Sequence, residues 1–83
     1  MGRKEKLITR FESIPADFTW NELCSLLNGF GYAVQTGSGS RRKFYKSATG
    51  HIISLHAPHP GSIVKKYALR QVLATLRETG ELK

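Results

Sequence analysis

The apolar residues of this chain change their spacing along its length. In residues 23–30 they recur at i, i+3, i+4 and i+7, which indicates one face of an amphipathic helix. Thr19 and Glu22 form a capping box before this stripe, and Gly31 supplies a left-handed stop after it. Helical spacing returns in residues 69–76, whereas apolar and polar residues alternate between the two stripes. This order predicts a sheet segment between two helices.

Further elements complete the expected order. Residues 3–12 predict a short amphipathic helix, and residues 32–36 predict a strand. Residues 41–46 and 51–56 predict a β-hairpin around a turn at residues 47–50. The predicted order is α-α-β-β-β-α, with no internal repeat and no second domain.

Length and composition favour one small domain over residues 1–83. A hydrophobic fraction of 40% suits a packed core rather than a disordered basic tail. Cys24 is the only cysteine, so there is no disulfide framework, and its place in an apolar stripe predicts a packed thiol. The N-terminus lacks the apolar run of a signal peptide, and no stretch is apolar enough to span a membrane. We therefore expect a cytoplasmic protein that does not associate with membranes.

The net positive charge lies in the second half of the chain. Residues 1–40 carry four basic and four acidic side chains, whereas residues 41–83 carry nine basic and two acidic ones, which accounts for the net charge of +7. Such segregation is typical of a phosphate-binding face with salt-dependent affinity, and a solvated Lys/Arg surface is the alternative. Cations interleaved with aromatic residues in residues 41–46 favour RNA or single-stranded nucleic acid as the partner.

The period of two along a strand sorts the hairpin side chains onto two faces. If Phe44 faces the core, Arg42 does so by register, although its head group can reach the sheet edge. The exposed face would then hold Arg41, Lys43, Tyr45 and His56.

Positive charge also gathers at the start of the last expected helix. Lys65 and Lys66 oppose the helix dipole there, and a bound anion would relieve that conflict. The residues predicted to bind RNA are Arg41, Arg42, Lys43, Tyr45, Lys46, Lys65, Lys66 and Arg70.

Histidine is the candidate residue type for proton transfer. Metal-free RNA cleavage needs a base for the 2′-hydroxyl proton, a cation for the phosphorane and an acid for the leaving oxygen. Residues 23–77 contain no carboxylate, which argues against a two-metal site, and the His56-x-x-His59 pair has no third metal ligand at a fitting spacing. We therefore expect no metal and no cofactor. His56 and His59 are the candidate catalytic residues, with a structural role as the alternative, whereas His51 at a strand end is expected to be a surface residue.

Several short motifs follow one another in a specific order. They are Gly29-Phe30-Gly31-Tyr32, a Gly-Ser loop that enters a basic strand, the Leu55-His56-x-Pro58-His59 connection, and Leu69-Arg70-Gln71-Val72-Leu73 before Gly80. Together they resemble the HicA family of toxins from type II toxin–antitoxin systems. The resemblance runs from about Trp20 to Leu82, and residues 1–19 extend beyond this family core.

The resemblance implies a fold, an activity and two partners. The family fold is similar to a double-stranded-RNA-binding domain, an α+β fold with a three-stranded antiparallel sheet and helices packed on one face. Family members are ribonucleases that cleave mRNA and are neutralised by a HicB-type antitoxin. The implied partners are therefore mRNA and an antitoxin of that type.

The Gly-Ser loop departs from the family pattern. Typical members carry a histidine directly after Gly-Ser that is held to be catalytic, whereas this chain has Ser40 or Arg41 there. A serine without a partner base is a poor general base, so the role does not pass to Ser40. Either His56, with His59 as the alternative, has taken over, or the protein binds RNA without cutting it well.

A DNA-binding transcription factor is a further interpretation of the positive charge. It is disfavoured because the cations lie on strands and at the start of the last helix, not along a recognition helix.

Overall fold

Helices and strands follow one another in the predicted order. The computed structural model describes residues 3–58 and 61–82. Its elements are α1 (Arg3–Glu12), α2 (Trp20–Gly29), β1 (Ala33–Thr36), β2 (Arg41–Lys46), β3 (His51–His56) and α3 (Lys66–Glu78). Within the described ranges, no helix has the length and apolar character needed to cross a membrane.

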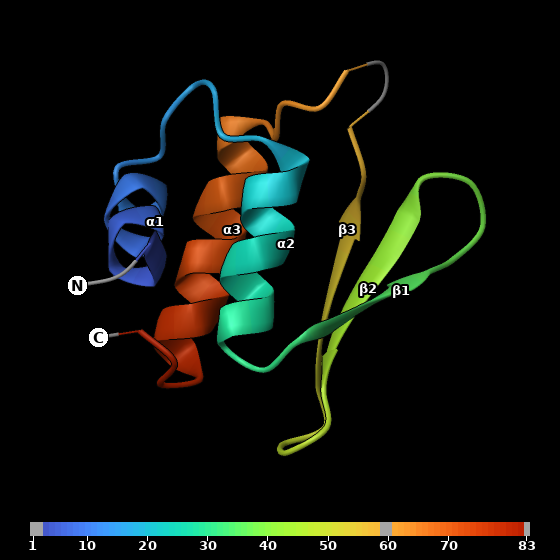
Figure 1. The fold of residues 1–83 in the computed structure, drawn as a ribbon. Helices are drawn as coiled ribbons and strands as arrows, with labels where there is room; N and C mark the ends of the chain where they lie inside the picture. Colours follow the sequence, from blue (N-terminus) through green and yellow to red (C-terminus); the bar gives the residue numbers. More distant parts are fainter. Residues whose placement is uncertain (1–2, 59–60, 83) are drawn as a thin grey trace.

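The strands form one antiparallel sheet in which β2 lies between β1 and β3. Phe44 of β2 lies opposite Val34 of β1 and Ile53 of β3, and Arg41 lies opposite His56. Figure 1 shows α2 and α3 against one face of the sheet, with α1 on the far side of these helices. The expected α+β fold, a three-stranded antiparallel sheet with helices packed on one face, is confirmed.

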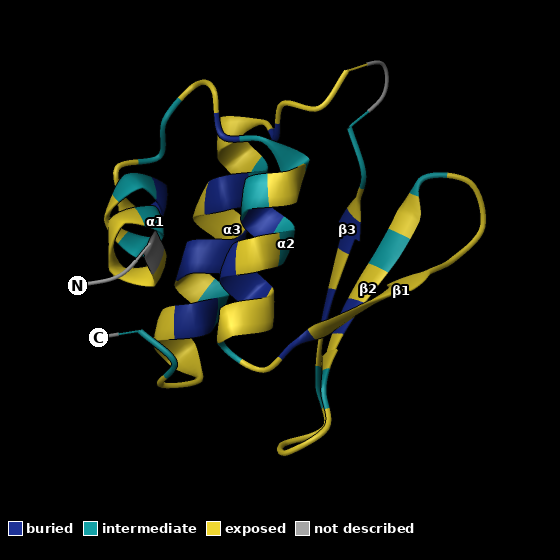
Figure 2. Cartoon of the chain, viewed as in Figure 1, coloured by how far each residue is buried: buried dark blue, intermediate teal, exposed yellow. Residues whose placement is uncertain are grey.

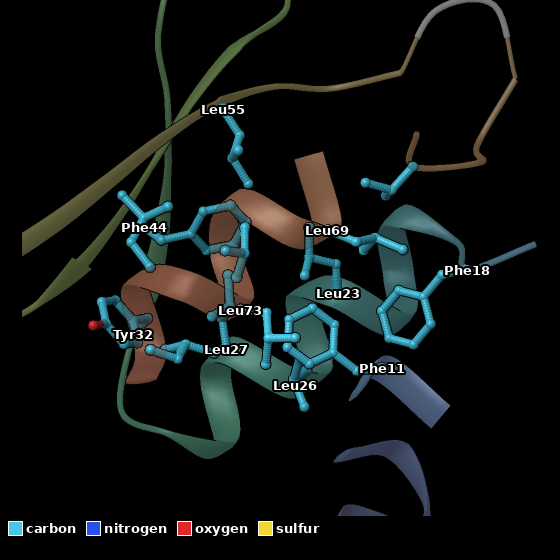
Figure 3. Packing of buried hydrophobic residues seen from close by; sticks show 14 residues of the cluster. Phe11, Phe18, Leu23, Leu26, Leu27, Tyr32, Phe44, Leu55, Leu69 and Leu73 are labelled. Carbon is cyan, nitrogen blue, oxygen red and sulfur yellow. The ribbon is translucent and has the colours of Figure 1, made fainter. Parts of the chain in front are cut away.

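The hydrophobic core fills the space between the sheet and the helices. Phe44, Ile53 and Leu55 reach it from the strands. The helices α2 and α3 contribute Leu23, Leu26, Leu27, Leu69, Val72, Leu73 and Leu76. Figure 2 shows this burial along the facing sides of the helices, and Figure 3 shows Phe44 and Leu55 pointing from the strands toward them. Each large side chain buried in this way stabilises the fold by roughly 1.5–3 kcal/mol.

The helix α2 begins with the capping box that the sequence predicts. The Glu22 amide donates a hydrogen bond to the Thr19 hydroxyl at 3.1 Å, and the Thr19 amide donates to the Glu22 carboxylate at 2.9 Å. The first of these bonds satisfies an amide that the first turn of a helix leaves without a partner. The helix ends at Gly29, and Gly31 has a φ of 97°, which glycine adopts without steric cost.

Arg10 fastens α1 to the start of α2. Its Nε lies 3.0 Å from Oε2 of Glu22, and its Nη2 donates to the Asp17 carbonyl at 2.9 Å. The guanidinium also lies 5.5 Å from the centre of the Phe18 ring. Phe11 and Phe18 are fully buried. The segment before residue 20, expected as an extension of the family core, therefore belongs to the same hydrophobic core.

Glu22 determines part of the pH dependence that we expect for stability. The hydrogen bond from Arg10, followed by the bond from the Thr19 amide, lowers the pKa of Glu22 from 4.5 to about 2. Folding therefore favours the ionised carboxylate, whose contribution is complete above pH 4.5 and is lost as the pH falls toward 2. Glu22→Ala should lower the free energy of unfolding by about 1–2 kcal/mol at pH 7, measured by urea denaturation.

The variant Glu22→Gln is the matched control. Its amide oxygen still accepts from the Thr19 amide, but it offers no charge to Arg10. We expect a smaller loss of stability at pH 7 and a shallower fall in stability between pH 4.5 and 2. If the stability of Glu22→Gln fell as steeply over this pH range as that of the wild type, the charge of Glu22 would make no contribution to stability.

Candidate nucleic-acid interface

The face of the sheet that the helices leave uncovered consists of exposed side chains. We call it the outer face and define it as Ala33, Gln35, Arg41, Lys43, Tyr45, Ile52, Ser54 and His56. These residues lie there because side chains alternate along a strand, and the buried Phe44, Ile53 and Leu55 occupy the other face.

The strand register arranges the outer face in rows across the sheet. The rows are Arg41–His56, Gln35–Lys43–Ser54 and Ala33–Tyr45–Ile52. The outer face carries two cations and no carboxylate, which suits a polyanion. The structure thus brings Arg41, Lys43, Tyr45 and His56 onto one face, and their roles stay predictions.

The Gly-Ser loop between β1 and β2 comes back to His56. The Ser40 hydroxyl lies 3.3 Å from Nδ1 of His56, at the long end of hydrogen-bonding distance, and the Ala57 amide donates to the Ser40 carbonyl at 2.8 Å. This contact was not predicted from the sequence. Extending the predicted hairpin register by one residue past Arg41 would have placed Ser40 beside the end of β3.

His56 lines at least two hollows that the described residues form. One, of about 290 Å³, is lined by Arg41, Arg42, Lys43, Ser54, Leu55 and His56. The other, of about 230 Å³, extends from His56 to Lys65 and Tyr67 at the start of α3. His56 therefore lies between the cations of β2 and those at the start of α3.

The cations of α3 that the sequence predicts as RNA contacts are exposed. Lys65 is the N-cap residue and makes no side-chain capping bond, and the first turn carries no acidic residue. Lys66 and Arg70 follow on the exposed surface of the helix. The first amides of any helix have no carbonyl partner within the helix, and together with the nearby cations they favour an anion at this end of α3.

Two other predicted RNA contacts lie on the helix side of the sheet. Arg42 donates through Nη1 to the carbonyls of Gly39 at 2.9 Å and of Arg41 at 2.8 Å, so it braces the loop. Lys46 forms an ion pair with Glu81, and its ammonium lies 5.8 Å from the centre of the Tyr32 ring. Both cations thus have protein partners, and RNA contact by them stays a prediction.

The three histidines have different surroundings. Nδ1 of His51 lies 2.8 Å from the Tyr32 hydroxyl, and the two rings meet edge to face with centroids 5.9 Å apart. Burial, followed by the charge of Glu81, raises the pKa of Tyr32, so its hydroxyl stays protonated. His51 is therefore half-buried in a structural contact rather than simply on the surface, whereas His56 is exposed on the outer face. His59 lies outside the described residues.

Metal binding and thiol chemistry are two further activities that protein side chains can provide. Within residues 3–58 and 61–82, no group of three or more His, Cys, Asp or Glu side chains could hold a metal ion. Cys24 is half-buried against the core, and burial raises the pKa of its thiol, which disfavours the reactive thiolate.

A family comparison matches residues 20–80 to the model described as the HicA toxin of bacterial toxin–antitoxin systems. The chain belongs to the HicA toxin family. Membership implies a toxin whose action an antitoxin opposes. No match is found among curated proteins or among solved structures. The family match starts at Trp20, so the buried Phe11 and Phe18 come from the part of this HicA chain that precedes it.

The surroundings of His51 and His56 predict that substitution of His51 lowers stability more than substitution of His56. His51→Ala removes one of the hydrogen-bond partners of the Tyr32 hydroxyl, which Thr79 also contacts, and should lower the free energy of unfolding by about 0.5–1.5 kcal/mol. His56→Ala removes an exposed side chain and should change it by no more than about 0.5 kcal/mol. Urea denaturation of both variants measures the difference, and equal losses would contradict the assignment of His51 to a structural contact.

Proposed function

We propose that this toxin is a metal-independent endoribonuclease that cleaves mRNA in the cytoplasm. The observation that carries the proposal is the position of His56 beside Arg41 on an exposed face without carboxylates. A proton-transfer group next to a cation is the minimum arrangement for cleavage by the 2′-hydroxyl of the RNA itself.

His56 is the proposed general base. It removes the proton of the 2′-hydroxyl, whose oxygen then attacks the adjacent phosphorus. The bond from phosphorus to the 5′-oxygen breaks, leaving a cyclic 2′,3′-phosphate and a 5′-hydroxyl that receives a proton from a general acid. Arg41 stabilises the additional negative charge on the phosphorane. His59 is the other candidate for proton transfer, as acid or as alternative base.

Ser40 has a supporting role in this proposal. It occupies the loop region where the family resemblance places histidine, and its hydroxyl lies 3.3 Å from Nδ1 of His56. If Nδ1–H of His56 donates to the Ser40 hydroxyl oxygen, this bond fixes the orientation of the imidazole and leaves Nε2 unprotonated, so that Nε2 can take the proton of the RNA. Ser40 is thus a positioning residue rather than a catalytic one.

The RNA backbone follows the cations around His56. Lys43 extends the positive charge along β2, and Lys65, Lys66 and Arg70 extend it onto α3 beyond the hollow that joins His56 to Lys65. Arg42 and Lys46 contribute to the same positive potential from the other face, where they also brace the protein.

An RNA-binding protein with weak or no catalysis is the second candidate function. It is favoured by one observation, the serine and arginine at the loop positions where the family resemblance places a catalytic histidine. This function needs the cations of the outer face but no proton transfer by His56.

Replacement of the proposed base tests the catalytic function. His56→Gln should keep the fold and the affinity for RNA but slow mRNA cleavage on the order of 100-fold, with a matching loss of growth arrest when the toxin is induced alone. New RNA ends mapped after induction measure cleavage. Urea denaturation and RNA binding of the variant are the controls.

The companion variant His59→Gln completes the test. If both histidine variants remain as toxic as the wild type, proton transfer by this segment is wrong. If the wild type binds RNA but produces no new RNA ends and no growth arrest, the binding function replaces the catalytic one.

We propose that the antitoxin is a HicB-type protein that covers the outer face. Filling the site with an acidic or apolar segment is the simplest inhibition, and Arg41 and Tyr45 are of the residue types that dominate such interfaces. Arg41→Glu should weaken antitoxin binding at least tenfold in a titration, whereas Arg77→Glu, a charge reversal on α3, should not. A complex that leaves Arg41, Lys43 and Tyr45 as accessible as in the free toxin would contradict this.

A further inference from the structure

One row of the outer face has no part in the proposed cleavage. Tyr45 and Ile52 lie directly opposite each other, and they are 36% and 49% exposed. Ala33 lies on the other flank of Tyr45 and offers only a methyl group to cover it. An aromatic ring and a branched apolar side chain are thus left in solvent on an otherwise polar and basic surface.

The position of this row relative to His56 is fixed by strand geometry. Arg41 and Tyr45 are four residues apart on β2, with Lys43 between them on the same face. Two residues along a strand span about 6.8 Å, so the apolar row lies on the order of 13 Å from the Arg41–His56 row. A cation therefore stands midway between the proposed site of cleavage and the apolar row.

From this arrangement we infer that the substrate is single-stranded, with one unpaired base stacked on Tyr45 and Ile52 at a fixed position from the cut phosphate. The inference rests on the proposed function. Arg41 and Lys43 bind successive phosphates of the RNA, which runs along β2. The connecting sugar–phosphate backbone then brings a base over the row formed by Ala33, Tyr45 and Ile52.

The chemistry of the row favours an unpaired base over a duplex. In an RNA duplex the faces of the bases are hidden in the stack, and proteins contact phosphates and 2′-hydroxyls instead. An aromatic ring exposed on an open sheet reaches a base face only when that base is unstacked. The absence of carboxylates from the outer face makes the whole surface compatible with a polyanion.

Binding of uncleavable RNA tests the inference apart from catalysis. The probe is a labelled single-stranded oligonucleotide with 2′-O-methyl groups, which removes the attacking hydroxyl, titrated with the full chain. Tyr45→Ala should weaken binding about 5- to 150-fold, which is the usual size of one base-stacking contact. Ile52→Ala should have a smaller effect, and Tyr45→Phe, which keeps the ring, should bind as the wild type does.

Val34→Ala is the matched control. Val34 is 48% exposed, close to the value for Ile52, but lies on the opposite face of the sheet, so its replacement should leave RNA affinity unchanged. Salt dependence distinguishes stacking from phosphate contact. Arg41→Ala and Lys66→Ala should each reduce the slope of log affinity against log salt by up to about 0.7, whereas Tyr45→Ala should not change it.

An abasic scan locates the stacked base. Removing the base at one position of the probe should weaken binding by the wild type, and Tyr45→Ala should then bind this probe as tightly as the wild type does. Removing a base at any other position should change neither the wild-type affinity nor the effect of Tyr45→Ala. A duplex probe of the same sequence should bind more weakly, with equal affinity for wild type and Tyr45→Ala.

Each alternative result has a distinct meaning. If Tyr45→Ala binds RNA as tightly as the wild type while Arg41→Ala binds it more weakly, the stacked base is wrong but the proposed function stands. No RNA binding by the wild type overturns both. Loss of antitoxin binding in Tyr45→Ala, with RNA affinity unchanged, assigns the apolar row to the protein partner and overturns the inference.

Discussion

The burial of Phe44 under the helices sets the two faces of the sheet. Phe44 is paired with Val34 and Ile53, so its neighbours Lys43 and Tyr45 must project to the other side. A slip of one residue in the register would turn these side chains toward the leucines of α2 and α3, where an unpaired charge is strongly destabilising. The packing of the hydrophobic core therefore determines which side chains form the charged surface.

The elements of the fold could be predicted because their signals are local. Thr19 and Glu22 are three residues apart and define the start of α2, and the period of two within residues 41–46 assigns Phe44 to the core. The contacts that complete the site are not local. Ser40 and His56 are 16 residues apart, and Lys46 and Glu81 are 35 residues apart. The hairpin register places Ser40 near the end of β3, but the contact of its hydroxyl with His56 depends on side-chain rotamers. The Lys46–Glu81 pair depends in addition on how the C-terminal segment folds against β2, which the hairpin register does not determine.

The contact between Ser40 and His56 bears on how one family can tolerate a change in its loop. Ser40 and His56 lie on different elements but meet at one end of the hairpin. On the proposed function, a proton-transfer group that moves from the loop to the strand stays near the same phosphate and the same Arg41. A different residue then transfers the proton, while the phosphate and Arg41 keep their positions relative to the proton-transfer group.

Residues that support the fold and residues that face the proposed substrate alternate one by one along β2. Positions 42, 44 and 46 brace the loop, the core and the C-terminal segment, whereas positions 41, 43 and 45 reach solvent. On the proposed function, cells that escape the toxin by mutation within β2 should therefore divide into two groups. Cells with a substitution at position 42, 44 or 46 should contain little toxin, because the fold is destabilised. Cells with a substitution at position 41, 43 or 45 should contain normal amounts of a folded but inactive toxin.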